Sequence, residues 1–216
     1  MPQASFKTNP VINAIIDELT KIYHCHTIIL YGSRARGDFT ETSDYDIAGI
    51  TDKSIKKEWI ARFDEINHIY HDIFIYPENE LFEPNESHLQ MSDGIILTEQ
   101  NGFGTRLLNQ LNTLIDEPLA SDVNELRGRA IWYKKTLSRA EANDLEGKYR
   151  QIWMIHSLLE DYFFFRDLRF LGPKKAFQYL ELHDKTTLGL FAKVLNDPIN
   201  TEKLKTLIMA ITEKYV

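Results

Sequence analysis

The chain has 216 residues and a formal net charge of −7, and its 43% hydrophobic and 12% aromatic content excludes an intrinsically disordered protein. No apolar run approaches the roughly 18–20 residues that span a bilayer, and residues 1–10 are polar and show no signal-peptide pattern, so we expect no association with membranes. Cys25 is the single cysteine, which rules out an internal disulfide and favours a cytoplasmic location.

The first predicted elements are a helix and a buried strand. Apolar side chains recur along one side of residues 11–22, as they do on an amphipathic helix. Residues 26–31 form a short apolar run rich in β-branched side chains, which is typical of a strand inside a sheet. These two segments therefore predict a helix followed closely by a core strand.

A candidate phosphate-binding turn follows this strand. Gly32 permits a sharp turn and a close approach of the backbone to a ligand. Ser33 is a suitable N-cap for a short helix that contains Arg34 and Arg36. Because N–H groups at a helix start lack partners within the helix, they attract anions, phosphate above all. The turn is therefore a predicted site for a phosphate group.

Two carboxylates lie on the next predicted strand, residues 44–50. Asp44 and Asp46 are two positions apart, so on a strand both side chains point to the same face. Two negative charges at that spacing repel each other unless a cation lies between them, and Mg²⁺ binds through carboxylates and substrate phosphates. The turn and the two acids together indicate a site for a metal-bound nucleoside triphosphate.

A third carboxylate is expected to join them. Residues 54–66 are a candidate for a second amphipathic helix, and residues 69–76 read as a strand whose apolar run Asp72 interrupts. A charge in a buried strand is costly unless it is paired or bound to a metal. If this strand lies beside the one that carries Asp46, the site has three carboxylates and room for two metal ions.

The remainder of the chain divides near Pro118. Before it, we expect a turn-rich loop over 77–87, a strand over 95–98, and a helix that carries Leu107 to Leu114. After it, the apolar periodicity is helical throughout and predicts a helical bundle. The expected helices there are 123–139, 145–170, 173–182, 187–195 and 201–215.

The motifs resemble those of a known superfamily. Tyr31-Gly32-Ser33 and Asp44-Tyr45-Asp46-Ile47, with Asp72 on a later strand, look like the signature of the DNA polymerase β nucleotidyltransferases, above all of their minimal and kanamycin-type bacterial branch. The resemblance covers roughly residues 10–117. It implies an α+β fold, in which a small mixed β-sheet with flanking helices forms a catalytic domain (1–118) and an all-α bundle (119–216) binds an acceptor or docks a partner.

The resemblance also implies roles for the three acids. Asp44 and Asp46 would hold two Mg²⁺ ions, and Asp72 would be a third metal ligand or the base for the acceptor hydroxyl. The implied reaction is in-line attack on the α-phosphorus of ATP, or of another nucleoside triphosphate, with pyrophosphate as the leaving group.

The same resemblance implies which residues contact the phosphates of the nucleotide. Gly32 and Ser33 would contact the β- and γ-phosphates, with Arg34 or Arg36 assisting. ATP is the family's usual nucleotide, and nothing in the residues themselves selects it. Nucleotide binding is thus expected from the turn together with the two acids of the following strand.

Charge is unevenly distributed along the chain, and this distribution indicates what kind of acceptor the protein would bind. Residues 1–118 contain nine Lys and Arg against 19 Asp and Glu, whereas residues 119–216 contain 16 against 13. An acidic catalytic half is poorly suited to duplex nucleic acid and suits a cationic substrate. We therefore expect AMP transfer to a hydroxyl of a small acceptor, for example an aminoglycoside-like compound. The alternative is an antitoxin-like or protein-modifying enzyme whose bundle binds a partner protein. Either a monomer or a homodimer is compatible with the sequence.

The predicted helix 145–170 carries a mixture of polar and aromatic side chains. His156 and Glu160 are one turn apart, and one interpretation makes this face the acceptor wall, with Glu160 or Asp161 as an auxiliary base. The simpler interpretation, which we favour, is a bundle helix with a satisfied histidine. Arg150 and His156 also fit the loose Arg-x(4–6)-His pattern of HEPN domains, which is short and frequent by chance.

Overall fold

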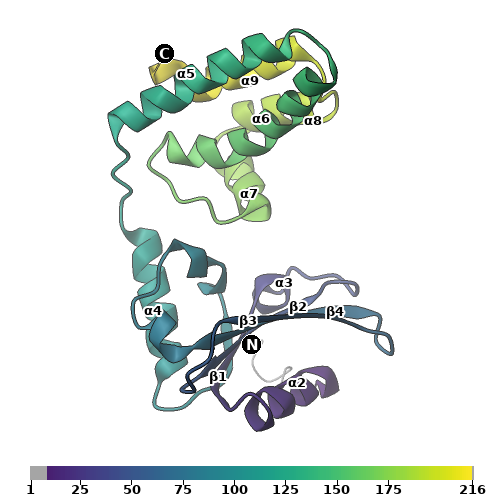
Figure 1. The fold of residues 1–216 in the computed structure, drawn as a ribbon, viewed down its shortest axis with the longest axis vertical. Helices are drawn as coiled ribbons and strands as arrows, with labels where there is room; N and C mark the ends of the chain where they lie inside the picture. Colours follow the sequence, from purple (N-terminus) through teal and green to yellow (C-terminus); the bar gives the residue numbers. More distant parts are fainter. Residues whose placement is uncertain (1–8, 216) are drawn as a thin grey trace. The chain divides into compact units, whose positions relative to one another are not determined.

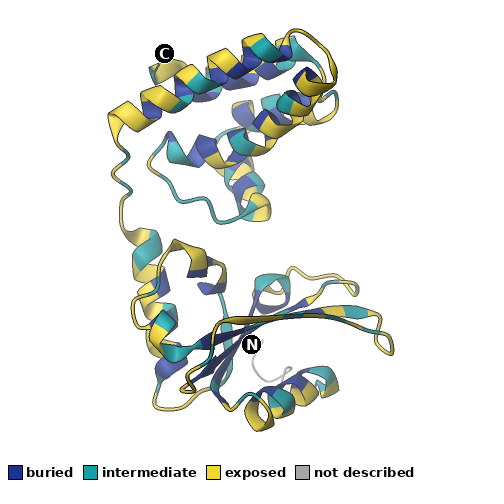
Figure 2. Cartoon of the chain, viewed as in Figure 1, coloured by how far each residue is buried: buried dark blue, intermediate teal, exposed yellow. Residues whose placement is uncertain are grey.

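The computed structural model describes residues 9–215, and these divide into two compact units between Glu117 and Pro118 (Figure 1). The division falls one residue from the boundary expected at Pro118. Each unit has a hydrophobic core of its own, and Figure 2 shows buried residues gathered inside each unit and exposed ones on its outside. The two units are therefore described separately.

The N-terminal unit is built on a five-stranded sheet with the order β3-β4-β2-β1-β5. β2 and β4 run parallel, and the other neighbouring pairs are antiparallel, so the sheet is mixed as predicted. The strands are β1 (Cys25–Tyr31), β2 (Tyr45–Thr51), β3 (Glu58–Asp64), β4 (Ile69–Pro77) and β5 (Ile95–Thr98).

One face of this sheet is covered by helix α2 (Pro10–Lys21), whose first N–H groups are capped by the side chain of Asn9. Its buried side chains Ile12, Ile15 and Leu19 pack on apolar residues of β1, β2 and β4. Because side chains alternate along a strand, the acids Asp46 and Asp72 point to the opposite face. Figure 1 shows α2 and the short helix α3 (Gly32–Arg36) on opposite sides of the sheet.

The remaining helical segments of the N-terminal unit follow β4. They are the 3₁₀ helices η1 (Glu78–Leu81) and η2 (Glu86–Met91) and the helix α4 (Phe103–Asp116). The surface loop expected over 77–87 therefore contains η1 and the start of η2. Asn85 caps η2 and His88 reaches back to the Asn85 N–H, a reciprocal pair of hydrogen bonds that gives this polar segment a regular backbone.

The helix predicted over 54–66 is wrong, because this segment is the edge strand β3. Its exposure alternates residue by residue, with Ile60 and Arg62 turned toward the α2 side and Trp59 and Phe63 exposed on the other. A tight turn connects β3 to β4, in which the Asp64 carboxylate accepts hydrogen bonds from the next residues' N–H groups. Pairing with β4 satisfies the backbone and overrides a helical apolar pattern.

Two smaller differences concern the site motifs. The strand expected over 44–50 begins at Tyr45, so Asp44 lies in the preceding loop. Ser33, expected as an N-cap, lies inside α3, whose N-cap position is Tyr31 and has no side-chain cap. The helix starts earlier because Gly32 adopts φ +71°, which turns the chain directly at the end of β1.

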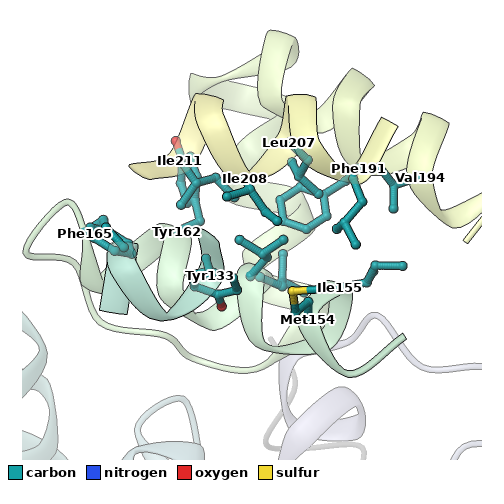
Figure 3. Close-up of a cluster of buried hydrophobic side chains, with 14 of the residues drawn as sticks. Tyr133, Met154, Ile155, Tyr162, Phe165, Phe191, Val194, Leu207, Ile208 and Ile211 are labelled. Atoms are coloured by element: carbon teal, nitrogen blue, oxygen red, sulfur yellow. The ribbon is translucent and has the colours of Figure 1, made fainter. Parts of the chain in front are cut away.

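The C-terminal unit is a bundle of helices, as predicted. They are α5 (Val123–Ala140), α6 (Leu145–Phe164), α7 (Pro173–His183), α8 (Lys185–Leu195), α9 (Thr201–Thr212) and η3 (Glu213–Tyr215). Asp122, Asp144, Asp184 and Asn200 cap the starts of α5, α6, α8 and α9. Figure 3 shows the core, in which Tyr133, Met154, Phe191 and Leu207 are buried among other aliphatic and aromatic side chains.

Helix α6 ends at Phe164, six residues before the predicted end. The chain leaves the helix through Asp167, which adopts φ +54°, and the N–H of Leu168 returns to the carbonyl of Phe163. Aromatic residues continue the apolar pattern into this turn and hide the helix end from sequence analysis. The predicted fold class, an α+β domain followed by an all-α bundle, is confirmed.

Candidate functional site

Two of the three predicted acids are direct neighbours in the sheet. The parallel pairing of β2 and β4 places Asp46 opposite Asp72, and adjacent strands lie about 4.8 Å apart. Their side chains share the face of the sheet away from α2. On the other side of β2, Asp46 pairs with Tyr31, the last residue of β1. The register therefore places both acids beside the turn that follows β1.

The turn itself packs against Asp46. Gly32 has φ +71°, and a Cβ atom at this position would lie 2.0 Å from Oδ2 and 2.8 Å from Cγ of Asp46. Only glycine leaves room for the carboxylate and adopts this backbone conformation without strain. The close contact between turn and acid, which the spacing of the motif suggests, is thus present in the fold.

Electrostatics link all three acids. Burial, together with the negative charges of Asp44 and Asp72, raises the pKa of Asp46 to about 6, and the positive charge of Arg36 opposes this shift. Burial also raises the pKa of Tyr31, with contributions from the same three acids. Asp44 therefore lies close enough to act on Asp46, although it precedes the strand and is exposed.

The site offers the oxygen ligands that a divalent cation prefers, but its side chains do not closely surround one. Among residues 9–215, no three His, Cys, Asp or Glu side chains converge closely enough to form a metal cage. Asp72 instead accepts a hydrogen bond at Oδ1 from the indole N–H of Trp59. The oxygen-only donor set and the repulsion that raises the pKa of Asp46 both fit Mg²⁺, which would neutralise that repulsion.

Arg34, expected to contact phosphate, is engaged elsewhere. It is buried, and its guanidinium donates to the backbone carbonyls of Ser43 at 3.0 and 2.6 Å and of Asp44 at 3.0 Å. Its plane also lies over the ring of Tyr45, with 4.1 Å from Cζ to the centroid. Arg34 therefore anchors the loop before β2 and fixes the backbone of Asp44, a role that burial decides and sequence does not reveal.

Arg36 lies nearer to the acids and is accompanied by a residue that sequence analysis missed. Its Nη1 is 3.2 Å from Oδ2 of Asp93 and its Nε is 3.4 Å from Oδ1 of Asp38. The charges of Arg36 and Asp93 both act on the pKa of Asp46. Asp93 belongs to an Asp-Gly pair just before β5, a pattern that by itself indicates only a turn.

The polar residues of α6 lie in different environments. His156 and Glu160 line an apolar cavity of ≈ 430 Å³ in the helical unit. Asp161, considered as an auxiliary base, is buried and accepts hydrogen bonds from Tyr133 Oη at 2.6 Å and from Arg129. Arg150 pairs with Glu146 one turn away. The hydrogen bonds that Asp161 accepts within the helical unit agree with the interpretation of α6 as mainly a bundle helix.

Comparison with known proteins decides the family of the N-terminal unit. Residues 13–101, from within α2 to just beyond β5, match the family described as polymerase beta, nucleotidyltransferase. This domain is a polymerase β-type nucleotidyltransferase. The match contains the glycine turn, all three acids and Arg36. The match therefore supports nucleotidyltransferase activity in this domain, and membership of the kanamycin-type branch stays a prediction.

Other comparisons add little to this assignment. A crystal structure of a nucleotidyltransferase-like protein from Exiguobacterium sibiricum has 16% sequence identity over 93% of this chain and 78% of its own, with a TM-score of 0.43. A search of curated proteins found no match. Within residues 9–215, none of the helices combines the length and the apolar composition that a membrane span requires.

Proposed function

We propose that this nucleotidyltransferase moves a nucleoside monophosphate, AMP from ATP, to a hydroxyl of a small-molecule acceptor with the help of Mg²⁺. The observation that carries the proposal is the position of Asp46, which is packed against the Gly32 turn on one side and paired with Asp72 on the other. The turn that would face the phosphates is then adjacent to the acids that would bind the cation. The excess of acidic residues in this half favours a cationic acceptor such as an aminoglycoside-like compound.

Each of the site's residues has a role in this proposal. Asp44 and Asp46 would hold Mg²⁺, which when bound supplies charge stabilisation for the attacking and leaving oxygens. Gly32 and Ser33 would face the phosphates through the backbone at the start of α3. Arg36 is better placed than Arg34 to assist them, because Arg36 acts on Asp46 while Arg34 is bound to backbone carbonyls.

Asp72 is the proposed base. The hydrogen bond from Trp59 occupies its Oδ1 and leaves Oδ2 to accept the proton of the acceptor hydroxyl. The hydroxyl oxygen forms a bond to the α-phosphorus, the bond between that phosphorus and the bridging oxygen breaks, and pyrophosphate leaves with the electron pair. Positioning and charge stabilisation then provide most of the acceleration.

A second candidate is favoured by one observation on the helical unit. Helix α6 exposes several large apolar side chains, namely Leu145, Tyr149, Ile152 and Trp153. Such a surface is compatible with an antitoxin-like or protein-modifying enzyme whose bundle binds a partner protein. In that case a stable complex with the partner would form and would survive substitution of the acids in the N-terminal unit.

The test is transfer of label from α-³²P-labelled nucleotides in the presence of Mg²⁺ to a panel of small acceptors, with pyrophosphate release measured in parallel. We expect Asp46→Asn and Asp72→Asn to reduce transfer at least about 100-fold. Asp52→Asn is the control, because Asp52 is exposed and pairs with Lys53 just beyond β2. Undiminished transfer in Asp46→Asn, or label transfer only to a co-purifying protein, would contradict the small-acceptor proposal.

A further inference from the structure

The face of the sheet that carries Asp72 continues onto the edge strand as a row of aromatic side chains. Antiparallel pairing of β3 with β4 places Trp59 opposite Phe74 and Phe63 opposite Tyr70. Because side chains alternate along strands, all four share the face of Asp72. We call Trp59, Phe63, Tyr70 and Phe74 the aromatic strip.

The aromatic strip is largely exposed to solvent. Trp59, Phe63 and Tyr70 are 63%, 44% and 59% exposed. The rings pair across the strands, Trp59 with Phe74 at a centroid distance of 6.1 Å and Phe63 with Tyr70 at 5.0 Å. Cross-strand pairing stabilises the hairpin, yet this contribution does not require Trp59, Phe63 and Tyr70 to be as exposed as they are. Large exposed apolar areas in a folded domain generally mark binding surfaces.

A carboxylate lies between the two ring pairs. Ala61 is the partner of Asp72 in the register, so no large side chain of β3 lies directly opposite this acid. The two pairs are four residues apart along β3, about 13 Å, with Asp72 near the midpoint. Trp59 also donates its indole N–H to Asp72, which couples the strip directly to the proposed base.

This combination favours one class of ligand. Aromatic faces attract cations and the C–H faces of rings, and the ammonium of Lys57 already lies 5.2 Å from the centroid of Phe74. A central carboxylate adds attraction for an amine and repels phosphate. The excess of acidic residues over residues 1–118 disfavours a nucleic acid strand for the same reason. A span of about 13 Å corresponds to two or three linked rings rather than one.

We propose that the aromatic strip is the acceptor subsite, and that it binds a multi-ring amine whose hydroxyl reaches Asp72. The proposal rests on the proposed function for the identity of the ligand as acceptor. Binding to the strip does not require nucleotide or metal, so it is measurable apart from transfer.

The first experiment measures binding by the emission of Trp59 in the full chain. The chain has three tryptophans, and Trp132→Phe and Trp153→Phe leave Trp59 as the only one. The probes are kanamycin (a multi-ring amine), glucosamine (a single-ring amine) and a twelve-nucleotide oligothymidylate. We expect kanamycin to quench this emission with a Kd at least ten-fold below that of glucosamine. Quenching by oligothymidylate alone, or by none of the probes, overturns the proposal.

The second experiment separates the strip from the reaction. Phe63→Ala and Tyr70→Ala should each raise the Kd for kanamycin at least ten-fold while the affinity for ATP with Mg²⁺ is unchanged. The matched control is Tyr149→Ala, because Tyr149 is 70% exposed and lies in the helical unit. Kanamycin binding that is unaffected by the strip variants, or lost equally in Tyr149→Ala, overturns the proposal. Kanamycin binding at the strip in a protein that transfers no nucleotide would refute the proposed function and leave the subsite standing.

The conservative variant Trp59→Phe tests the coupling to Asp72. It retains a ring for stacking and removes the N–H that Asp72 accepts. We expect the Kd for kanamycin to change less than three-fold, whereas kcat falls. An unchanged kcat would show that Trp59 contributes only packing, contrary to the proposed geometry.

Discussion

At the scale of single residues, the site is defined by Asp46, whose charged carboxylate is destabilised by its surroundings. Asp46 is part-buried, paired with Asp72 across the strands and covered by the Gly32 turn. Burial and two neighbouring acids raise its pKa to about 6. Without a cation, the ionised carboxylate of Asp46 therefore lowers the stability of the folded state, as is common for titratable residues at functional sites.

Asp46→Asn should consequently stabilise the metal-free protein while it abolishes transfer. From about pH 4 to about pH 6 the unfolded chain ionises Asp46 and the folded chain does not, so the free energy of unfolding of the wild type falls as pH rises through this window. The variant lacks this term, and we expect it to be about 1–2 kcal/mol more stable at pH 7.5. Urea denaturation across pH 4–8 without divalent ions checks this. Equal pH dependence in the two proteins would contradict the raised pKa of Asp46.

Gly32→Ala should damage both stability and activity. The added Cβ would meet the Asp46 carboxylate and would also strain a backbone at φ +71°. Gly37 is a matched control, because it has φ +83° and nothing lies within 4 Å of an added Cβ. We expect Gly37→Ala to cost about 1–2 kcal/mol and to retain transfer, and Gly32→Ala to cost about 3 kcal/mol or more and to lose it. Equal losses in urea denaturation and transfer assays would mean that only backbone strain matters.

At the scale of elements, the edge strand β3 is the main departure from sequence-based expectation. Residues 54–66 contain apolar side chains that fit a helix, yet the partner strand β4 supplies a complete row of backbone hydrogen-bonding groups. The decision depends on pairing with residues that follow a turn, and no local pattern contains it. Only a strand places Trp59 and Phe63 on the face of Asp72, as the proposed acceptor subsite requires.

The attachment of α2 to β3 is testable through one ion pair. Arg62 on β3 donates from both terminal nitrogens to the Glu18 carboxylate on α2, at 2.9 and 2.6 Å. A double-mutant cycle of Glu18→Gln and Arg62→Met, followed by urea denaturation, should give a coupling of about 1 kcal/mol. The same cycle for the exposed pair Asp17 and Lys21 should give less than about 0.5 kcal/mol. A coupling energy no larger than that of this exposed pair would show that the bidentate ion pair between Arg62 and Glu18 contributes no additional stability.

At the scale of the whole molecule, the chain contains two hydrophobic cores of different construction. One lies between α2 and the sheet, and the other lies among the helices of the C-terminal unit. The tryptophans report on them separately, since Trp59 is in the first unit and Trp132 and Trp153 are in the second.

Substitutions in each core should therefore act first on the signal of their own unit. Phe191→Ala in the helical core and Ile47→Ala in the sheet core remove fully buried side chains, and we expect losses of about 3–5 and 2–4 kcal/mol. Unfolding followed by the emission of single-tryptophan variants should show the first loss in Trp132 and the second in Trp59. The opposite assignment would contradict the division into two units.

The sequence by itself determined the succession of the glycine turn and the acid pair, the sheet-forming strands β1, β2, β4 and β5, and the helical second half. These follow from local causes, namely turn-forming residues, β-branched runs and 3.6-residue periodicity. Only the tertiary structure decided that Arg34 is buried in a structural role, that Asp93 lies near Asp46, and that Asp72 lies between exposed rings. The physical reason is that burial and strand register depend on segments far apart in the chain, whose pairing no local pattern encodes.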